Sequence, residues 1–313
     1  MVKSFLIGTS NAAPHLYRGI EVLKKGGSII DAVEAAVNGV EESPDSGNVG
    51  VGGSPNILGV IELDASIMDG ATMKTGAVGC VSKYWQAISI ARKVMEDSPH
   101  AFLVGDGAHR FAKAVGFQEC DLHTEKSRTL AKAMALDGFK SLPDDWPNKE
   151  YYVKAAQELN LHEWYKRLSD EHQGTTNVIG MDSKGNICVG VSTSGTSMKF
   201  PGRVGDSPII GAGNYCDNKI GGVACTGRGE LTIRRLTSRM IIKYMEDGFS
   251  LEKAVTRAFK ELHALKDGSC QCIALDKQGN TISANMSRTS SYYYMDIDMA
   301  EPEERKGILV EVD

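Results

Sequence analysis

The chain has 313 residues, of which 42% are hydrophobic and 24% are charged, as is typical of a globular protein with a sizeable core. Its formal net charge of −5 argues against a nucleic-acid partner or an anionic membrane surface, because both attract a basic face. No apolar run is long enough to span a bilayer, and the N-terminal segment lacks the long apolar region of a secretory signal, so we expect a cytoplasmic protein.

In the N-terminal half, the hydrophobic periodicity predicts one short strand followed mainly by helices. Between Ser28 and Glu42, for example, apolar residues recur at helical spacing, and Asp31 and Glu34 fall on the opposite face. The segment 43–56 is rich in glycine, serine and proline, which predicts a loop. The predicted elements are a strand at 2–8, helices at 13–25 and 28–42, strands at 59–63 and 65–68, a helix at 83–96, a strand at 101–104, and helices at 107–115 and 126–136.

The C-terminal half begins with a change of composition. Residues 137–150 carry two prolines and several charges, which predicts an exposed connection before a helix at 151–169. Alternating residues from Thr175 to Thr193 predict a hairpin that turns at 183–186. The remaining predicted elements are helices at 230–245 and 251–266, a hairpin at 270–285 that turns at 276–279, a packed strand at 290–296, and a charged, loosely held tail at 299–313.

Helices and paired strands occur in both halves, which favours an α+β fold with two central sheets flanked by helices, in a single domain of residues 1–313. The seven cysteines are scattered, and only Cys270 and Cys272 are close together. An odd, scattered set favours reduced and mostly buried thiols. A CxC pair without further ligands at metal spacing does not indicate a metal site, so neither a metal nor a cofactor is predicted.

Four features between residues 172 and 230 carry the chemistry expected of an amide hydrolase that acts on a free amino acid. Together they supply a hydroxyl nucleophile, a clamp for a carboxylate, a clamp for an ammonium group and a small-residue oxyanion site. The four features are Gly174 with Thr175 at the start of the hairpin, Thr193 in a turn, Arg203 with Asp206 in a loop, and Thr226 with Gly227 in a glycine-rich turn.

Thr175 needs a base to act as a nucleophile, and His172 is the only candidate nearby in the sequence. A cut between Gly174 and Thr175 would give Thr175 a free α-amine, whose pKa of about 7.7–8.0 suits a general base. One residue would then supply both nucleophile and base, which makes His172 redundant and favours its interpretation as a connector. Gly174 leaves room for the strained backbone that an internal attack on its carbonyl requires.

Each of these features also has a plain structural interpretation. An ST-turn would explain Thr193, and a surface ion pair worth under about 1 kcal/mol would explain Arg203 with Asp206. Gly202, Gly205 and Pro208 favour a tightly shaped loop around that pair instead. The glycine-rich segments do not connect a strand to a helix, as a dinucleotide or phosphate-binding loop would.

Several motifs in the same order give the chain a resemblance over nearly its whole length. It is similar to the N-terminal nucleophile hydrolases of the glycosylasparaginase and isoaspartyl peptidase/asparaginase family, and it resembles glycosylasparaginase most. The motifs are KKGGSIIDAVEAAV, GNVGVGGSPN, LDASIMDGATMKTGAVGCV, AISIARKVMEDSPHAFLVGDGA, GMDSKGNICVGVSTSG, GRVGDSPIIGAGNYCDN and ACTGRGE.

The resemblance implies a four-layer αββα sandwich that cuts itself between Gly174 and Thr175, into an α-subunit of residues 1–174 and a β-subunit of residues 175–313. It further implies a small-molecule substrate (glycosylasparagine, asparagine or a β-aspartyl peptide) whose side-chain amide is hydrolysed. No cofactor, metal, nucleic acid or membrane is implied, and two cleaved protomers would pair as a dimer of αβ heterodimers.

The resemblance also assigns roles residue by residue. Thr175 matches the nucleophile, and Thr193 matches the threonine that assists it. Arg203 matches the residue that holds the substrate α-carboxylate, a role that suits a guanidinium fork. Asp206 matches the carboxylate that holds the α-ammonium group. The oxyanion hole is matched by Thr226 and Gly227.

The sequence departs from glycosylasparaginases at three places. Because of these differences, the leaving group of the substrate could be a sugar amine, ammonia or an amino acid. The usual His-Asp-Thr at the cut is replaced by His172-Gln173-Gly174-Thr175, and glycine before threonine is typical of the asparaginases and isoaspartyl peptidases. Ser10 stands where a tryptophan would wall the substrate pocket, and Asn48 replaces a serine.

Three functions therefore follow from the sequence. The first expectation is an N4-(β-N-acetylglucosaminyl)-L-asparaginase, and the second is an isoaspartyl dipeptidase with L-asparaginase activity. The third, suggested by the missing indole, is an uncleaved, non-catalytic binding protein.

Overall fold

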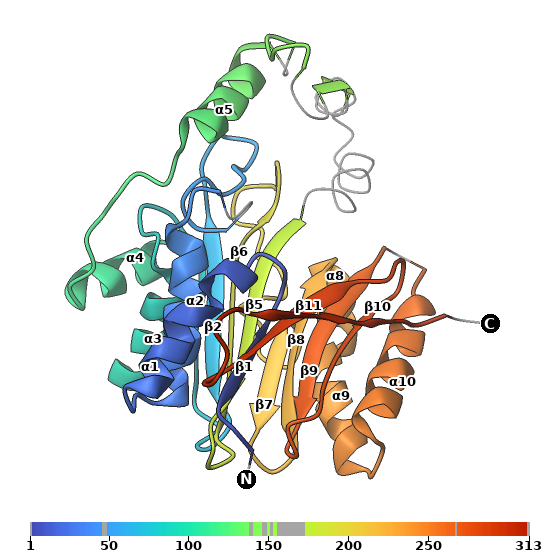
Figure 1. Cartoon of the computed structure of the whole chain (residues 1–313). Helices are drawn as coiled ribbons and strands as arrows, with labels where there is room; N and C mark the ends of the chain where they lie inside the picture. The colour runs from blue at the N-terminus through green and yellow to red at the C-terminus, as the bar shows by residue number, and fades with distance from the viewer. Residues whose placement is uncertain are drawn as a thin grey trace.

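The computed structural model describes residues 2–45, 49–137, 140–145, 149–150, 153–154, 173–266 and 268–311. These residues form two β-sheets that pack against each other, and helices cover the outer face of each sheet (Figure 1). The predicted α+β composition is confirmed.

The larger sheet has eight strands in the order β12-β11-β1-β5-β6-β2-β3-β4. Strand β1 pairs with β5 on one side and β11 on the other, so the N-terminal strand lies between two strands of the C-terminal half. All pairs are antiparallel except β3 with β4. The strands are β1 (Phe5–Gly8), β2 (Leu63–Asp69), β3 (Thr75–Val81), β4 (Phe102–Val104), β5 (Gln173–Met181), β6 (Ile187–Thr196), β11 (Ser291–Asp296) and β12 (Glu303–Lys306).

The smaller sheet has five strands in the order β13-β10-β9-β8-β7. Its strand β8 packs against β5 and β6 of the larger sheet, and this contact brings the two halves of the candidate site together. The strands are β7 (Asn214–Asp217), β8 (Gly221–Gly227), β9 (Cys270–Asp276), β10 (Thr281–Asn285) and β13 (Ile308–Leu309).

Three clusters of buried apolar side chains join these layers, because each sheet face and each helix stripe must be removed from water. One cluster lies between the larger sheet and its helices, a second between the smaller sheet and its helices, and a third between the two sheets. The helices on the larger sheet are α1 (Leu16–Lys24), α2 (Ile29–Glu42), α3 (Ala87–Asp97) and α4 (Gly105–Ala114), and those on the smaller sheet are α9 (Thr237–Glu246) and α10 (Leu251–His263). The other helices are η1 (Ala13–His15), α5 (Glu125–Asp137) and α8 (Gly229–Arg235).

The hairpin of β5 and β6 shows how local sequence fixes the site. Asp182 accepts a hydrogen bond from the backbone N–H of Asn186 at 2.9 Å, and Gly185 adopts a φ of +82° that favours glycine. The hairpin that follows pairs Thr175 with Thr193. The turn predicted at 183–186 is thus confirmed, and so is the hairpin at 270–285.

Four predictions about elements are wrong or incomplete. The strand predicted at 59–63 is wrong, since only Leu63 of that segment belongs to a strand, and β3, β7 and β8 were not predicted. The helix predicted at 230–245 is interrupted at Leu236, whose φ of 48° lies in the left-handed region and separates α8 from α9. The described part of the predicted tail, residues 299–311, is not loose, because β12 and β13 hold it to the edges of the two sheets.

The helix predicted at 151–169 lies outside the described residues except for 153–154.

Candidate active site

The candidate nucleophile lies at the beginning of β5, where the strand is irregular. Gly174 pairs with Gly195 and Thr175 with Thr193, so the register shifts by one residue between these two pairs. The shift leaves Ser194 of β6 as the extra residue, opposite the bond predicted to be cut. His172 lies outside the described residues.

The hydroxyl group of Thr193 joins both sides of that bond. It accepts from the backbone N–H of Gly195 at 2.8 Å and donates to the carbonyl oxygen of Gly174 at 2.5 Å. The Thr175 hydroxyl donates to Thr193 Oγ1 at 3.4 Å. Thr193 is thus placed to polarise the Gly174 carbonyl and to contact the hydroxyl that would attack it.

Arg203 lies close to Gly195, two residues after Thr193, and Glu230 holds its side chain in place. Its Nε and Nη2 atoms donate to the Glu230 carboxylate at 2.9–3.1 Å, a bidentate arrangement that fixes the guanidinium plane. Its Nη1 atom lies 3.2 Å from the position of a Cβ on Gly195 and 2.9 Å from that of a Cβ on Gly205. A side chain at either glycine would contact the guanidinium group too closely. Glycine at both positions therefore leaves room for the Arg203 side chain.

Asp206 is the second predicted binding residue, and it is nearly enclosed, with 5% of its surface exposed. The Thr232 hydroxyl donates to its Oδ2 atom at 2.7 Å. Burial raises the pKa of the Asp206 carboxyl to about 6, and the hydrogen bond from Thr232 and the charge of Arg203 act against this rise. A substrate ammonium group would compensate the buried negative charge.

Gly227 ends β8, next to Thr226, and its backbone requires glycine. Its φ is +127°, and a Cβ at this position would lie 2.6 Å from the carbonyl oxygen of Ser269. Thr226 lies across from β5, and its hydroxyl is hydrogen-bonded to Asn177 of that strand at 2.6 Å. The predicted oxyanion residues therefore lie on the strand of the smaller sheet that faces the candidate nucleophile.

The turn after β1 contains Ser10, the position where the sequence lacks the expected indole. Ser10 is exposed, whereas Asn11 turns toward the nucleophile and donates from Nδ2 to the carbonyl oxygen of Thr175 at 3.3 Å. The Thr9 hydroxyl donates to Asn11 Oδ1 at 2.8 Å and fixes that amide. Asn48, the third departure, lies outside the described residues.

A buried ion pair behind the site was not predicted from the sequence. Lys199 is 3% exposed, and its Nζ atom donates to the carbonyl oxygen of Glu62 at 3.0 Å and lies 3.9 Å from Asp64 Oδ2. Asp64 pairs with Thr193 across β2 and β6. Some residues contact the site only from distant positions in the sequence or from another strand, so no local sequence pattern predicts them. They are Lys199, Glu230, Thr232 and Asn177.

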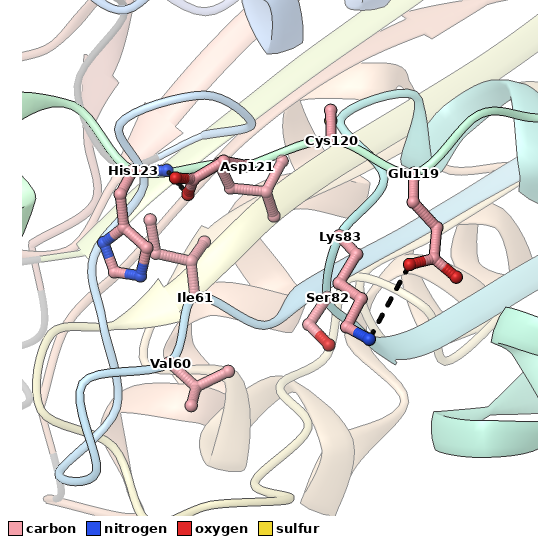
Figure 2. A pocket seen from close by; sticks show the side chains of 9 residues that line it. Val60, Ile61, Ser82, Lys83, Glu119, Cys120, Asp121 and His123 are labelled. Atoms are coloured by element: carbon pink, nitrogen blue, oxygen red, sulfur yellow. Dashed lines mark hydrogen bonds and ion pairs between the residues drawn. The ribbon is translucent and has the colours of Figure 1, made fainter.

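A separate surface groove of about 520 Å³ does not contain the predicted residues (Figure 2). Across it, Lys83 Nζ lies 3.7 Å from the Glu119 carboxylate. Among the described residues, no group of three or more His, Cys, Asp or Glu side chains is placed to hold a metal ion. The same residues include no helix that is long and apolar enough to cross a membrane.

Comparison with known proteins finds relatives over most of the chain. The family model described as asparaginase matches residues 10–301. The chain is 36% identical over 265 residues to the human isoaspartyl peptidase/L-asparaginase, covering 85% of this chain and 79% of the relative. It is 37% identical over 287 residues to the N(4)-(β-N-acetylglucosaminyl)-L-asparaginase of Elizabethkingia miricola, covering 88% and 77%. It is also 35% identical over 287 residues to the plant-type L-asparaginase of Pyrococcus abyssi, covering 91% and 88%.

Proposed function

The chain belongs to the asparaginase family and is an amidohydrolase, and on this basis we propose that it cuts itself between Gly174 and Thr175 and then hydrolyses the side-chain amide of an N4-substituted asparagine. The observation that carries the proposal is the Thr193 hydroxyl, which contacts both the Gly174 carbonyl oxygen and the Thr175 hydroxyl.

In self-cleavage, Thr175 Oγ1 attacks the carbonyl carbon of Gly174, and the hydrogen bond from Thr193 stabilises the charge that develops on the carbonyl oxygen. The C–N bond breaks, the nitrogen takes the hydroxyl proton, and Gly174 is left as an ester on Thr175. Water then hydrolyses the ester. The products are a carboxylate on Gly174 and a free α-amine on Thr175.

In turnover, Arg203 and Asp206 hold the substrate α-carboxylate and α-ammonium groups and place its side-chain carbonyl before Thr175. Thr175 Oγ1 attacks that carbon while the α-amine of the same residue accepts the proton. The proton passes to the leaving amine as the amide bond breaks. Water resolves the acyl-enzyme and releases aspartate. The oxyanion of each step is held by Thr226 and the N–H of Gly227.

We take glycosylasparagine as the first substrate to test. The motif order of the sequence and the 37% identity to a glycosylasparaginase support it. A β-aspartyl dipeptide or L-asparagine is the second, because Gly174 precedes the nucleophile and Ser10 leaves the pocket without an aromatic wall. The relatives named isoaspartyl peptidase/L-asparaginase support this alternative.

The same proposal extends to the assembly of the protein. We expect the helix and sheet layers to be the αββα sandwich of the N-terminal nucleophile hydrolases, in one domain, with cut protomers paired as a dimer of αβ heterodimers. Seven free thiols support a reducing, cytoplasmic location. Size-exclusion chromatography with light scattering tests the assembly.

Intact-mass analysis tests self-cleavage. Of the 313 residues, 174 precede the bond and the remaining 139 follow it, and we expect two fragments of these lengths. Thr175→Ala should give one uncut chain without activity. A wild-type chain that stays whole after long incubation would instead favour the non-catalytic binding protein.

Initial rates on glycosylasparagine, a β-aspartyl dipeptide and L-asparagine identify the substrate. We expect aspartate from glycosylasparagine. If the cut protein turns over only the dipeptide or asparagine, the second candidate replaces the first.

A further inference from the structure

Asn177 connects the candidate nucleophile strand to the candidate oxyanion strand. It lies two residues after Thr175 on β5, so the two side chains point to the same face of the strand. Its side chain is enclosed between the sheets. The Nδ2 atom lies 3.1 Å from the carbonyl oxygen of Cys225 and 2.6 Å from the Thr226 hydroxyl, both at the end of β8.

The partners of Asn177 determine which way its amide points. A backbone carbonyl oxygen only accepts hydrogen bonds, so the atom facing Cys225 must be the amide nitrogen. The same nitrogen then gives its second hydrogen to Thr226 Oγ1, and the Thr226 hydroxyl is the acceptor. The Oδ1 atom of Asn177 is buried without a partner among the described residues, so the side chain bonds through its NH₂ group alone.

This bond has a consequence for the Thr226 proton. Because one lone pair of Thr226 Oγ1 faces Asn177, the O–H hydrogen must point elsewhere, and the described residues offer it no acceptor. A hydroxyl that is fixed in this way presents its hydrogen to whatever occupies the site.

We propose that Asn177 is a positioning residue that orients the Thr226 hydroxyl as a hydrogen-bond donor to the oxyanion formed in turnover. The inference rests on the proposed function. An oxyanion donor must already point at the developing charge to be effective, and removal of one such donor can lower kcat by about a hundred- to a thousand-fold. Loss of the orienting bond leaves the donor in place but free to rotate, so we expect a smaller loss.

The position of Asn177 predicts that its effect is confined to turnover. Self-cleavage acts on the Gly174 carbonyl, whose oxygen is bonded by Thr193 and not by Thr226. Substrate binding depends on Arg203 and Asp206, neither of which touches Asn177. The backbone of Asn177 is paired with Thr9 at 3.0 and 3.1 Å, independently of its side chain, so a substitution leaves the strand in place.

The test is a double-mutant cycle with purified, fully cut protein, using whichever of glycosylasparagine, a β-aspartyl dipeptide and L-asparagine the wild type hydrolyses. Asn177→Leu removes the donor at similar size and should lower kcat about tenfold, with KM within about threefold and complete cleavage by intact mass. Thr226→Val should lower kcat about a hundredfold. The double variant should match Thr226→Val alone, because Asn177 acts only through that hydroxyl.

Two further variants distinguish a loss of the orienting hydrogen bond from a general effect on folding. Asn177→Asp has the same shape, but its carboxylate would accept the Thr226 proton and withdraw it from the substrate, so kcat should fall by at least tenfold. Thr176→Val is the matched control, since this neighbouring side chain is equally buried and points to the other face of β5. Its kcat should equal that of the wild type.

The outcomes separate the inference from the function it rests on. If both Asn177 variants are fully cut and retain kcat within twofold, or if the losses of Asn177→Leu and Thr226→Val multiply, the inference is wrong while the amidohydrolase stands. If Thr226→Val leaves kcat unchanged, both the inference and the assigned oxyanion hole are wrong. A wild type that hydrolyses no such amide overturns the proposed function itself.

Discussion

Replacing Thr232 by Val should raise the pKa of the Asp206 carboxyl and move the acid limb of the pH profile to higher pH. The Thr232 hydroxyl donates to Asp206 Oδ2 at 2.7 Å in a buried setting, and this bond favours the ionised carboxylate. Only the ionised form can hold the substrate ammonium group. A raised pKa therefore lowers kcat/KM at acidic pH and leaves it unchanged at alkaline pH.

The size of the shift follows from the hydrogen bond. A hydrogen bond to a charged group is worth about 1.5–3 kcal/mol, and one pKa unit corresponds to about 1.4 kcal/mol, so the shift is about one to two units. The Asp206 pKa, about 6 in the wild type, would rise to about 7–8 in the variant. At pH 6 the ionised fraction would fall from about one half to between a tenth and a hundredth, which lowers kcat/KM about five- to fiftyfold.

The assay is kcat/KM between pH 5 and 9.5 for the wild type, Thr232→Val and the control Thr232→Ser, which keeps the hydroxyl. The Thr175 amine must also be neutral, and its pKa is about 7.7–8.0. In a plot of log(kcat/KM) against pH, the wild type should therefore show a slope of one between about pH 6 and 8 and a slope of two below about pH 6. In Thr232→Val, slope two should begin between about pH 7 and 8, at the raised pKa of Asp206. An unchanged break, or an equal loss at every pH, would refute the assignment of Asp206.

Three other changes test separate parts of the structure. Arg203→Ala should raise KM at least tenfold and leave self-cleavage intact, as followed by kinetics and intact mass, and normal KM would place the carboxylate clamp elsewhere. Gly227→Ala should lower kcat about a hundredfold, because its Cβ would meet Ser269 O at 2.6 Å and displace the end of β8. Glu41 is fully buried and burial raises its pKa to about 8 from 4.5, so between these pH values the folded state keeps a proton that the unfolded state loses. Stability should therefore fall as pH rises across this window, by up to about 1.4 kcal/mol per unit, and Glu41→Gln should remove that slope in urea titrations at pH 5.5 and 7.5. Equal slopes in both proteins would contradict the buried neutral acid.

The elements that could be predicted from sequence are those with a local signature. The β5–β6 turn is set by Asp182 and Gly185, and α2 is N-capped by Ser28 in a capping box that involves Asp31. Strand β8 was missed because its first residues, Gly221 and Gly222, carry no side chain, and their strand form depends on pairing with β9. The tail was misjudged because the charges of β12 lie on an edge strand, where charge is tolerated.

The candidate site likewise contains residues that could be proposed from the sequence and residues that could not. Thr175, Arg203 and Asp206 could be proposed as site residues because motif order and residue chemistry point to them. The residues that hold them, such as Glu230 on Arg203 and Thr232 on Asp206, were missed, since a buried hydrogen bond across the fold leaves no pattern in the sequence.

The strand order has a consequence for the fate of the two products of self-cleavage. Strands β1 and β2 precede the bond between Gly174 and Thr175. Yet β1 is inserted between β11 and residues 178–181 of β5, and β2 is joined to β6, and all of these partners follow the bond. Separation of the two pieces would break the backbone hydrogen bonds on both sides of β1 and on one side of β2. It would also expose the apolar side chains between the two sheets to water. The proposed cut would thus change the connectivity of the chain and not its architecture: the interleaved pieces would stay one body, and either piece alone would be an open-edged, aggregation-prone fragment.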